Sequence, residues 1–290
     1  MKLTLSAVQF EHRPLGHFDE FAAQVEGHVR FAASFGSRLV CFPEYVTAPL
    51  LSIGAADARD PRAWQRWTGP FIDLMLGLAR RYDVYILGGT HLVQEEDRCF
   101  NTAYFFTPSG QILTQRKLHL TPCEIEPWRL GTGDAVHVFE TPIGSLAILI
   151  CFDIEFPEAA RAAVDAGAQI LLCPSATDDR QGFYRVRYCC LARAVENQVY
   201  VVHAPLVGRL PRVPFFEQSY GRAAIIAPCD TPCPPDGIVV EGEWNQDLVV
   251  TGVIDLDLLP RLHAAGSVTP RRVRRSEYPA RRITLASSPS

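Results

Sequence analysis

The chain has 290 residues, 48% of them hydrophobic and 21% charged, and a formal net charge of −4 at pH 7. This composition is ordinary for a soluble globular protein, and the acidic balance gives a nucleic-acid-binding role no global support. No apolar run reaches the roughly 18 residues of a membrane span, and the first residues alternate like a strand rather than forming a signal peptide.

Hydrophobic periodicity predicts strands and helices that follow one another along the chain. The expected strands span 3–8, 39–42, 84–90, 101–106, 111–114, 136–140, 146–150, 169–173, 199–203, 220–227 and 248–255. The expected helices span 16–35, 64–82, 157–166 and 183–195. We expect an α/β fold in which residues 1–265 form one domain.

The last residues, 266–290, are expected to form a basic arm. Between residues 260 and 290 there are seven arginines and one acidic residue, Glu277. A basic tail could bind nucleic acid or acidic lipid. We favour an arm packed on the body or on a partner subunit, because Val268, Val273 and Tyr278 are spaced as buried anchors.

Nine cysteines, an odd number, lie mostly inside apolar segments. We therefore expect reduced thiols in a cytoplasmic protein. Cys229 and Cys233 are four positions apart, but no second pair stands at zinc-ribbon spacing. Incidental thiols in a loop are favoured there over a metal site.

One cysteine stands out by its position. The apolar run from Leu146 to Ile150 leads directly into Cys151, and a helical pattern begins at Pro157 and stops at Gly167. This order predicts a buried strand, a sharp turn and a helix. A side chain at the carboxyl end of a strand, beside a helix start, is a common place for a nucleophile.

Two charged residues also follow β-like runs. Glu44 comes after Pro43, which bars continuation of a strand, and Lys117 follows a predicted hairpin. Taken alone, each is more simply interpreted as a solvated charge. With Cys151 they could perform acyl chemistry: the carboxylate takes the thiol proton, while the ammonium and the Phe152 N–H stabilise an oxyanion. No metal-ligand spacing occurs near them, so we expect neither metal nor cofactor.

Four motifs, in order, carry a resemblance to a known family. They are C-F-P-E-Y around Glu44, R-K-L-H-L around Lys117, I-C-F-D-I-E-F-P-E around Cys151, and A-R-A-V-E-N-Q-V-Y-V-V at 192–202. With these motifs the chain resembles the nitrilase superfamily, the carbon–nitrogen hydrolases, over roughly residues 1–280.

The resemblance implies a four-layer α-β-β-α sandwich and a homodimer or higher homo-oligomer. It also implies Glu44 as general base, Lys117 as oxyanion stabiliser and Cys151 as nucleophile. Members often have a second glutamate after the lysine, which positions the lysine and the substrate. Glu124 and Glu126 compete for this role, and the I-E-P-W-R-L-G context leads us to choose Glu126.

Three further residues are expected to contact substrate. Tyr45 and Phe152 would line an acyl pocket. Many relatives carry a His-Trp pair near the positions of Arg185 and Val186, so the substrate of this chain is expected to differ. Arg185 could bind a substrate carboxylate, or it could form a salt bridge on the surface of its helix.

These features together favour an enzyme that hydrolyses a small carboxamide through a Cys151 thioester. Phe152 stands where true nitrilases typically have tryptophan, which favours an amide over a nitrile. An N-carbamoyl hydrolase is the nearest alternative, and a nitrilase is third. A non-catalytic binding protein would require a degenerate triad, whereas all three residues are present.

Overall fold

The computed structural model describes residues 1–54, 57, 59–275 and 279. Its strands are β1 (Lys2–His12), β2 (Leu39–Cys41), β3 (Tyr85–Glu95), β4 (Arg98–Phe106), β5 (Ile112–Arg116), β6 (Val138–Thr141), β7 (Gly144–Ile148), β8 (Ile170–Ser175), β9 (Tyr200–Gly208), β10 (Ala224–Ile226), β11 (Ile238–Glu241) and β12 (Leu248–Asp255). Its α-helices are α1 (Phe18–Ser34), α2 (Thr68–Tyr82), α3 (Pro122–Ile125), α4 (Pro157–Asp165), α5 (Arg180–Asn197), α6 (Leu258–Ala265) and α7 (Pro270–Val273). Short 3₁₀ helices are η1 (Ala48–Ser52), η2 (Pro61–Trp67) and η3 (Cys151–Glu155). In the described ranges, no helix has both the length and the apolar character needed to cross a bilayer.

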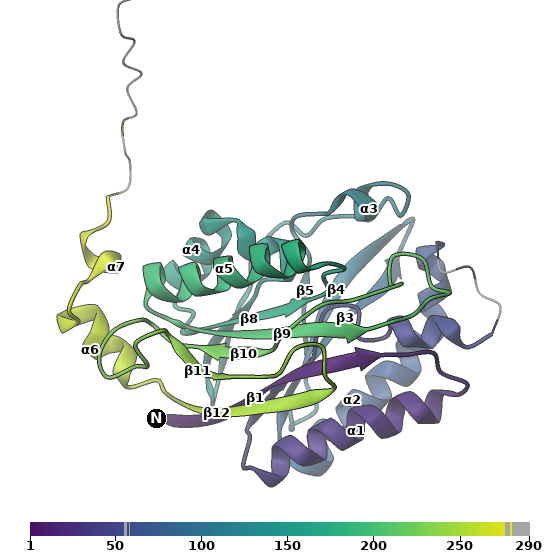
Figure 1. Ribbon diagram of the computed structural model, residues 1–290, viewed down its shortest axis with the longest axis horizontal. Helices are drawn as coiled ribbons and strands as arrows, with labels where there is room; N and C mark the ends of the chain where they lie inside the picture. Colours follow the sequence, from purple (N-terminus) through teal and green to yellow (C-terminus); the bar gives the residue numbers. More distant parts are fainter. Residues whose placement is uncertain (55–56, 58, 276–278, 280–290) are drawn as a thin grey trace, which may run out of the picture.

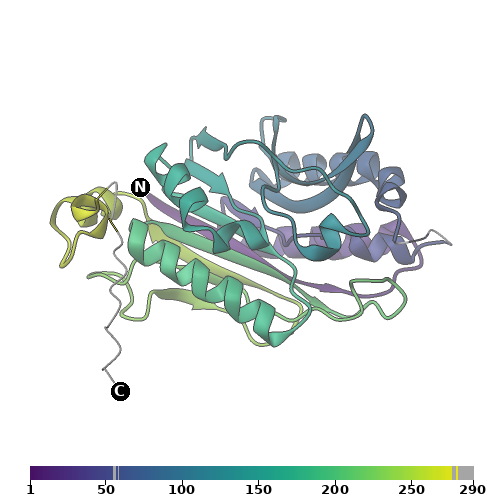
Figure 2. The same cartoon turned by 90° about the horizontal axis from the view of Figure 1, so that it is seen from above.

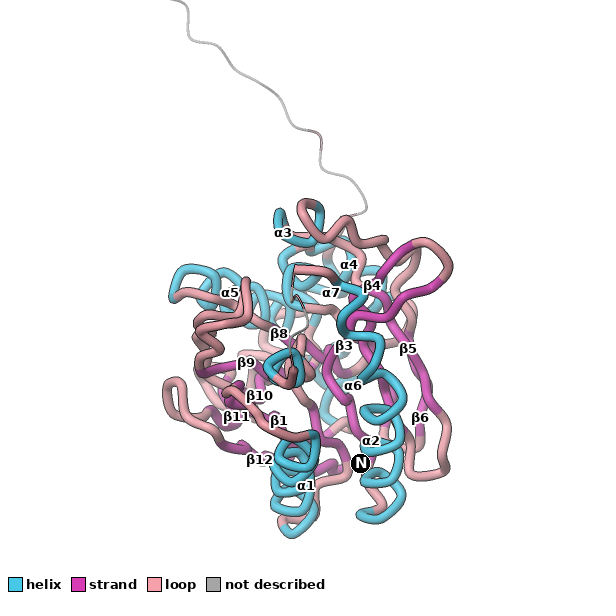
Figure 3. Tube along the Cα trace, turned by 90° about the vertical axis from the view of Figure 1, so that its right-hand side faces the viewer, coloured by secondary structure: helices cyan, strands magenta, loops and turns pink. Residues whose placement is uncertain are grey.

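The strands hydrogen-bond in the order β5-β4-β3-β2-β1-β9-β8-β7-β6, with β12 on β1 and the β10–β11 pair on β9. This sheet curls so that its two ends face each other: the rings of Phe105 on β4 and Phe139 on β6 stack with centroids 6.1 Å apart. Helices α1 and α2 cover one outer face, and α4 and α5 cover the other (Figures 1 and 3). The expected α/β fold, a four-layer α-β-β-α sandwich, is confirmed.

Both faces of the central strands are buried, which explains their continuous apolar runs. Along β2, Leu39 and Cys41 belong to the core between the two sheet halves. Val40 and Phe42 point to the opposite face and join the core beneath α1 and α2. Successive side chains of a strand alternate in this way, so one short run of apolar residues serves two layers.

The structure departs from the expected elements at several points. Strand β3 does not end at Thr90, directly after the two glycines, as expected, but continues to Glu95, with an irregular register against β4 between Leu87 and Thr90. The helix expected at 64–82 is the 3₁₀ helix η2 followed by α2. The short helix α3 lies in a segment expected to be a loop, and β11 and α6 were not expected. Periodicity alone did not detect these short or interrupted elements.

The described part of the C-terminal arm contacts the body at the end of the molecule that also holds the N-terminus (Figure 2). Arg274 forms an ion pair with Asp165 of α4 at 2.6 Å, and Arg271 donates to the Val164 carbonyl at 3.3 Å. These arginines therefore bind the C-terminal end of α4, where carbonyl groups and a carboxylate favour positive charge.

The apolar residues of the arm behave differently from the expectation. Val268 and Val273 are 69% and 70% exposed in the single chain, so they are not buried anchors on its body. The third expected anchor, Tyr278, lies outside the described residues. Polar contacts, not these valines, hold the described part of the arm.

Candidate active site

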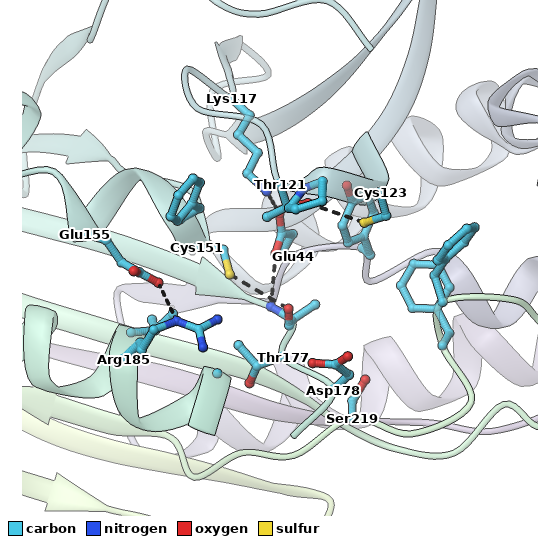
Figure 4. A pocket seen from close by; sticks show the side chains of 18 of the residues that line it. Glu44, Lys117, Thr121, Cys123, Cys151, Glu155, Thr177, Asp178, Arg185 and Ser219 are labelled. Carbon is cyan, nitrogen blue, oxygen red and sulfur yellow. Dashed lines mark hydrogen bonds and ion pairs between the residues drawn. The ribbon is translucent and has the colours of Figure 1, made fainter. Parts of the chain in front are cut away.

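Glu44, Lys117 and Cys151 lie on one pocket, although they come from distant parts of the chain (Figure 4). Each follows the end of a strand: β2, β5 and β7, respectively. The pocket has a volume of about 360 Å³, which suits a small molecule. The Glu44 and Lys117 side chains are each only 1% exposed, so neither is the solvated charge that each residue alone suggests.

The backbone around Glu44 is set by its contact with β3. The Thr90 N–H donates to the Pro43 carbonyl at 3.3 Å, and the Tyr45 N–H donates to the Thr90 hydroxyl at 2.9 Å. Gly89 has a φ of +69°, and a Cβ there would lie 1.9 Å from the Pro43 carbonyl oxygen. Only glycine permits this approach, which holds the Glu44 segment against the irregular part of β3.

The turn that carries Cys151 is held by a buried carboxylate, Asp153. Cys151 has a φ of 47°, in the left-handed region, and its thiol donates to the Ala176 carbonyl at 3.8 Å. Asp153 accepts hydrogen bonds from the Ile150 N–H at 3.2 Å and the His119 N–H at 2.8 Å. Asp153 thus connects the turn to the segment that follows Lys117. Such support is required for a residue in a strained conformation, which here directs the thiol into the pocket.

A buried network surrounds the lysine. The Lys117 ammonium donates to Glu44 at 2.8 Å and to both carboxylate oxygens of Glu124 at 2.9 and 2.8 Å. The Asn101 amide donates to the same two carboxylates, at 2.9 Å each. Two carboxylates therefore share one cation and one neutral donor, the kind of pairing that buried charges require.

The structure does not bring Glu126 to this network, which corrects the choice between the two glutamates. Glu126 is 66% exposed and faces Arg129 at 3.4 Å. Glu124 instead contacts Lys117, and its carboxylate also accepts from the Thr121 N–H at 2.8 Å and the Thr121 hydroxyl at 2.9 Å. The sequence holds a signal for this arrangement, since Thr121 and Glu124 have the spacing of a helix capping box.

The two glutamates differ in their affinity for a proton. Burial raises the pKa of Glu44, and the charge of Lys117 offsets only part of this effect. Burial also acts to raise the pKa of Glu124, but Lys117 and the hydrogen bonds from Thr121 and Tyr45 outweigh it and lower the pKa. Of the two carboxyl groups, Glu124 is therefore the one held in its charged form, and Glu44 is the one suited to exchange a proton.

The pKa values of Lys117 and Cys151 are also shifted by their surroundings. Burial acts to lower the pKa of Lys117, but Glu44 and Glu124 raise it well above its ordinary value, so the ammonium stays charged. Burial and the charge of Glu44 raise the pKa of Cys151. The Cys151 side chain is thus held as a neutral thiol, and any attack by its sulfur requires a group that takes the proton.

The expected substrate-contacting residues all line the pocket. Phe152 and Tyr45 do so, and the Tyr45 hydroxyl also donates to Glu124. Arg185 lines the pocket and pairs with Glu155 at 3.6 Å, with 64% of its side chain exposed. The arginine therefore has both the position expected of a substrate contact and the ion pair expected of a surface residue.

Sequence reasoning missed other residues of the site. Asn101 carried a detectable signal, because an amide side chain is unusual in a strand that leads into the apolar run from Ala103 to Phe106. Further pocket residues come from segments without a regular pattern: Trp128, Thr177, Asp178, Phe215, Phe216 and Ser219. Within the described ranges, no three His, Cys, Asp or Glu side chains are grouped as metal ligands.

The family follows from comparison with known proteins. The model of the carbon–nitrogen hydrolase family matches residues 4–263. The chain belongs to the carbon–nitrogen hydrolase family. This agrees with the four-layer fold and with the motifs around the three convergent residues.

Individual known proteins are also similar to the chain. A probable hydrolase of Bacillus subtilis, YhcX, is 44% identical over 277 residues, which are 94% of this chain and 54% of that protein. The chain thus spans about half the length of that relative. The omega-amidase NIT2 of Xenopus tropicalis is 27% identical, with coverage of 95% and 96%. The crystal structure of Saccharomyces cerevisiae Nit3, a nitrilase superfamily member, has a TM-score of 0.76 at 21% identity, with coverage of 94% and 97%.

Proposed function

We propose that this carbon–nitrogen hydrolase is an amidase that cleaves small carboxamides through a thioester on Cys151. The observation that carries the proposal is the buried network of Lys117 with Glu44 and Glu124 beside the thiol. It combines a proton acceptor, a fixed cation and a nucleophile in one small pocket. The omega-amidase relative supports an amide as the substrate.

Acylation begins when the Cys151 sulfur attacks the carbonyl carbon of the amide. Glu44 takes the thiol proton, because its raised pKa makes it a better base than an ordinary carboxylate. The negative oxygen of the tetrahedral intermediate is stabilised by Lys117 and by the Phe152 N–H at the start of η3, where helix N–H groups lack intrahelical partners. Collapse of the intermediate breaks the C–N bond. Glu44 returns the proton to the departing ammonia or amine.

Deacylation uses the same groups. A water molecule attacks the thioester carbon, and Glu44 takes a proton from it. Collapse of the second intermediate breaks the C–S bond, and the proton on Glu44 returns to the sulfur. Glu124 keeps its charge throughout and positions Lys117, the role that the sequence resemblance led us to expect for Glu126. The products are a carboxylic acid and ammonia or an amine.

The test uses a change at the nucleophile and a matched change at a second thiol. Cys151→Ala should lower ammonia release from carboxamides by about 10³-fold or more, because the covalent route is removed. Cys123→Ala is the control: this thiol lines the same pocket but has no role in the mechanism. Mass spectrometry of quenched wild-type enzyme should detect an acyl adduct on the peptide that contains Cys151.

The same assay decides between the possible substrates. Carboxamides, N-carbamoyl amines and nitriles are to be compared, with Cys151→Ala as the blank. If the enzyme turns over only the carbamoyl compounds, it is an N-carbamoyl hydrolase and not an amidase. Undiminished hydrolysis by Cys151→Ala would overturn the mechanism itself.

A further inference from the structure

Not every charged side chain that lines the pocket forms an ion pair with another side chain. Lys117 is matched by two carboxylates, and Arg185 is matched by Glu155. Asp178 also lines the pocket, but its exposed carboxylate makes no hydrogen bond or ion pair within the described part of the chain. The pocket therefore has one carboxylate whose charge no side chain balances.

The backbone on both sides of Asp178 is fixed. The Thr177 hydroxyl donates to the Tyr220 carbonyl at 2.9 Å, and the Tyr220 N–H donates to the Thr177 carbonyl at 2.7 Å. Asp179 caps α5 by accepting from the Gly182 N–H at 2.6 Å. Asp178 is thus an unengaged side chain on a rigid support, which is how binding groups are commonly held.

The surroundings of Arg185 disfavour a negative group on the substrate. Its partner Glu155 is only 18% exposed, and burial raises the pKa of this carboxyl, so the glutamate needs its cation. A carboxylate bound at Arg185 would compete with Glu155. Figure 4 shows Asp178 across the same pocket, on the other side of Thr177, where its charge would repel such an anion.

We propose that Asp178 selects substrates with a positively charged group at the end opposite to the amide, so that the substrate class is ω-amino amides. The ammonium group pairs with the Asp178 carboxylate while the amide carbon lies at Cys151. The aromatic side chains of Trp128, Phe215 and Phe216 give the intervening alkyl chain an apolar wall. This inference rests on the proposed amidase function and adds the substrate class to it.

The experiment compares three unbranched amides that differ only at the distal end: 5-aminopentanamide, hexanamide and adipic acid monoamide. Wild-type enzyme should show the highest kcat/KM for the ammonium compound and the lowest for the carboxylate compound. Asp178→Asn should lower the ratio of kcat/KM for 5-aminopentanamide to that for hexanamide by about fivefold, the effect of one partly exposed ion pair. Glu126→Gln removes an exposed carboxylate outside the pocket and should leave the ratio unchanged.

Binding to Cys151→Ala, measured by calorimetry, separates recognition from chemistry. The dissociation constants of the three amides should follow the same order, and adding Asp178→Asn should weaken the ammonium compound selectively. If wild-type enzyme hydrolyses none of the amides, the proposed function fails, while these constants still decide the present inference. Preference for the carboxylate compound, no binding of the ammonium compound, or an unchanged ratio in Asp178→Asn would overturn it.

Discussion

The segments that carry Glu44 and Glu124 both place a carboxylate on Lys117, but they are built in different ways. The Glu44 segment is held by its backbone, which packs on β3 at Gly89, and its carboxylate receives donors from Lys117, Asn101 and the Ala176 N–H. The Glu124 carboxylate is itself an anchor of its segment, because it also accepts from Thr121 and Tyr45.

This difference in support gives the two carboxylates, which share the Lys117 ammonium, different affinities for a proton. More donors to the carboxylate favour its charged form, so the pKa of Glu124 falls while burial raises that of Glu44. Environment, and not residue type, thus sets the two glutamates apart, and in the proposed mechanism Glu44 transfers the proton while Glu124 supports Lys117. Replacing each glutamate in turn by glutamine tests whether the two carboxylates differ in this way.

The largest effect is expected from Glu44→Gln. The amide can still accept a hydrogen bond from Lys117, but it cannot take the thiol proton. Amide hydrolysis should therefore fall by about 10²- to 10⁴-fold. Ammonia release measures this loss, and Glu126→Gln is the matched control, since its side chain is exposed and outside the site. Equal activity of Glu44→Gln and the control would show that Glu44 is not the general base.

A smaller effect, on the pH dependence of kcat/KM, is expected from Glu124→Gln, and its direction distinguishes the roles of the two glutamates. In wild-type enzyme the raised pKa of Glu44 places the acidic limb of kcat/KM above the ordinary glutamate value of 4.5. The negative charge of Glu124 contributes to that rise, so its removal should lower the Glu44 pKa and move the limb to lower pH. A pH profile of kcat/KM checks the direction. A limb that stays in place or moves to higher pH would contradict the division of roles.

The smallest effect is expected from Thr121→Ala, which removes one hydrogen bond to Glu124. A hydrogen bond to a charged group contributes about 2 kcal/mol, and urea unfolding should show a loss of this order. Thr269→Ala is a matched control, because Thr269 also precedes a proline at a short helix but its hydroxyl makes no side-chain cap hydrogen bond. Equal losses in both variants would mean that Thr121 does not support Glu124 in particular.

Sequence periodicity located the buried strands well, because each long apolar run serves two hydrophobic layers. It ended β3 too early, at Thr90 directly after Gly88 and Gly89, since glycines usually mark a strand end. Here they mark a close approach between two backbones, which depends on Pro43, far away in the sequence. A local pattern holds no information about that distant contact.

The candidate site likewise contains residues that local sequence patterns predict and others that only the tertiary structure reveals. The positions of Glu44, Lys117 and Cys151 at strand ends, together with the family resemblance of the motifs around them, predicted their convergence. Glu126 was chosen over Glu124 from its neighbours along the chain, whereas burial beside Lys117 favours Glu124. Residues such as Asp178 lie in irregular segments, whose paths are determined by packing rather than by periodicity.

The contact between Gly89 and Pro43 also bears on how this enzyme can be redesigned. It joins main-chain atoms of two adjacent segments, so no exchange of side chains elsewhere can reproduce it. Phe215, Phe216 and Ser219 belong to a separate stretch of the chain that lines the same pocket. Libraries that vary this stretch are therefore expected to change which substrates the pocket accepts while leaving the placement of Glu44 untouched.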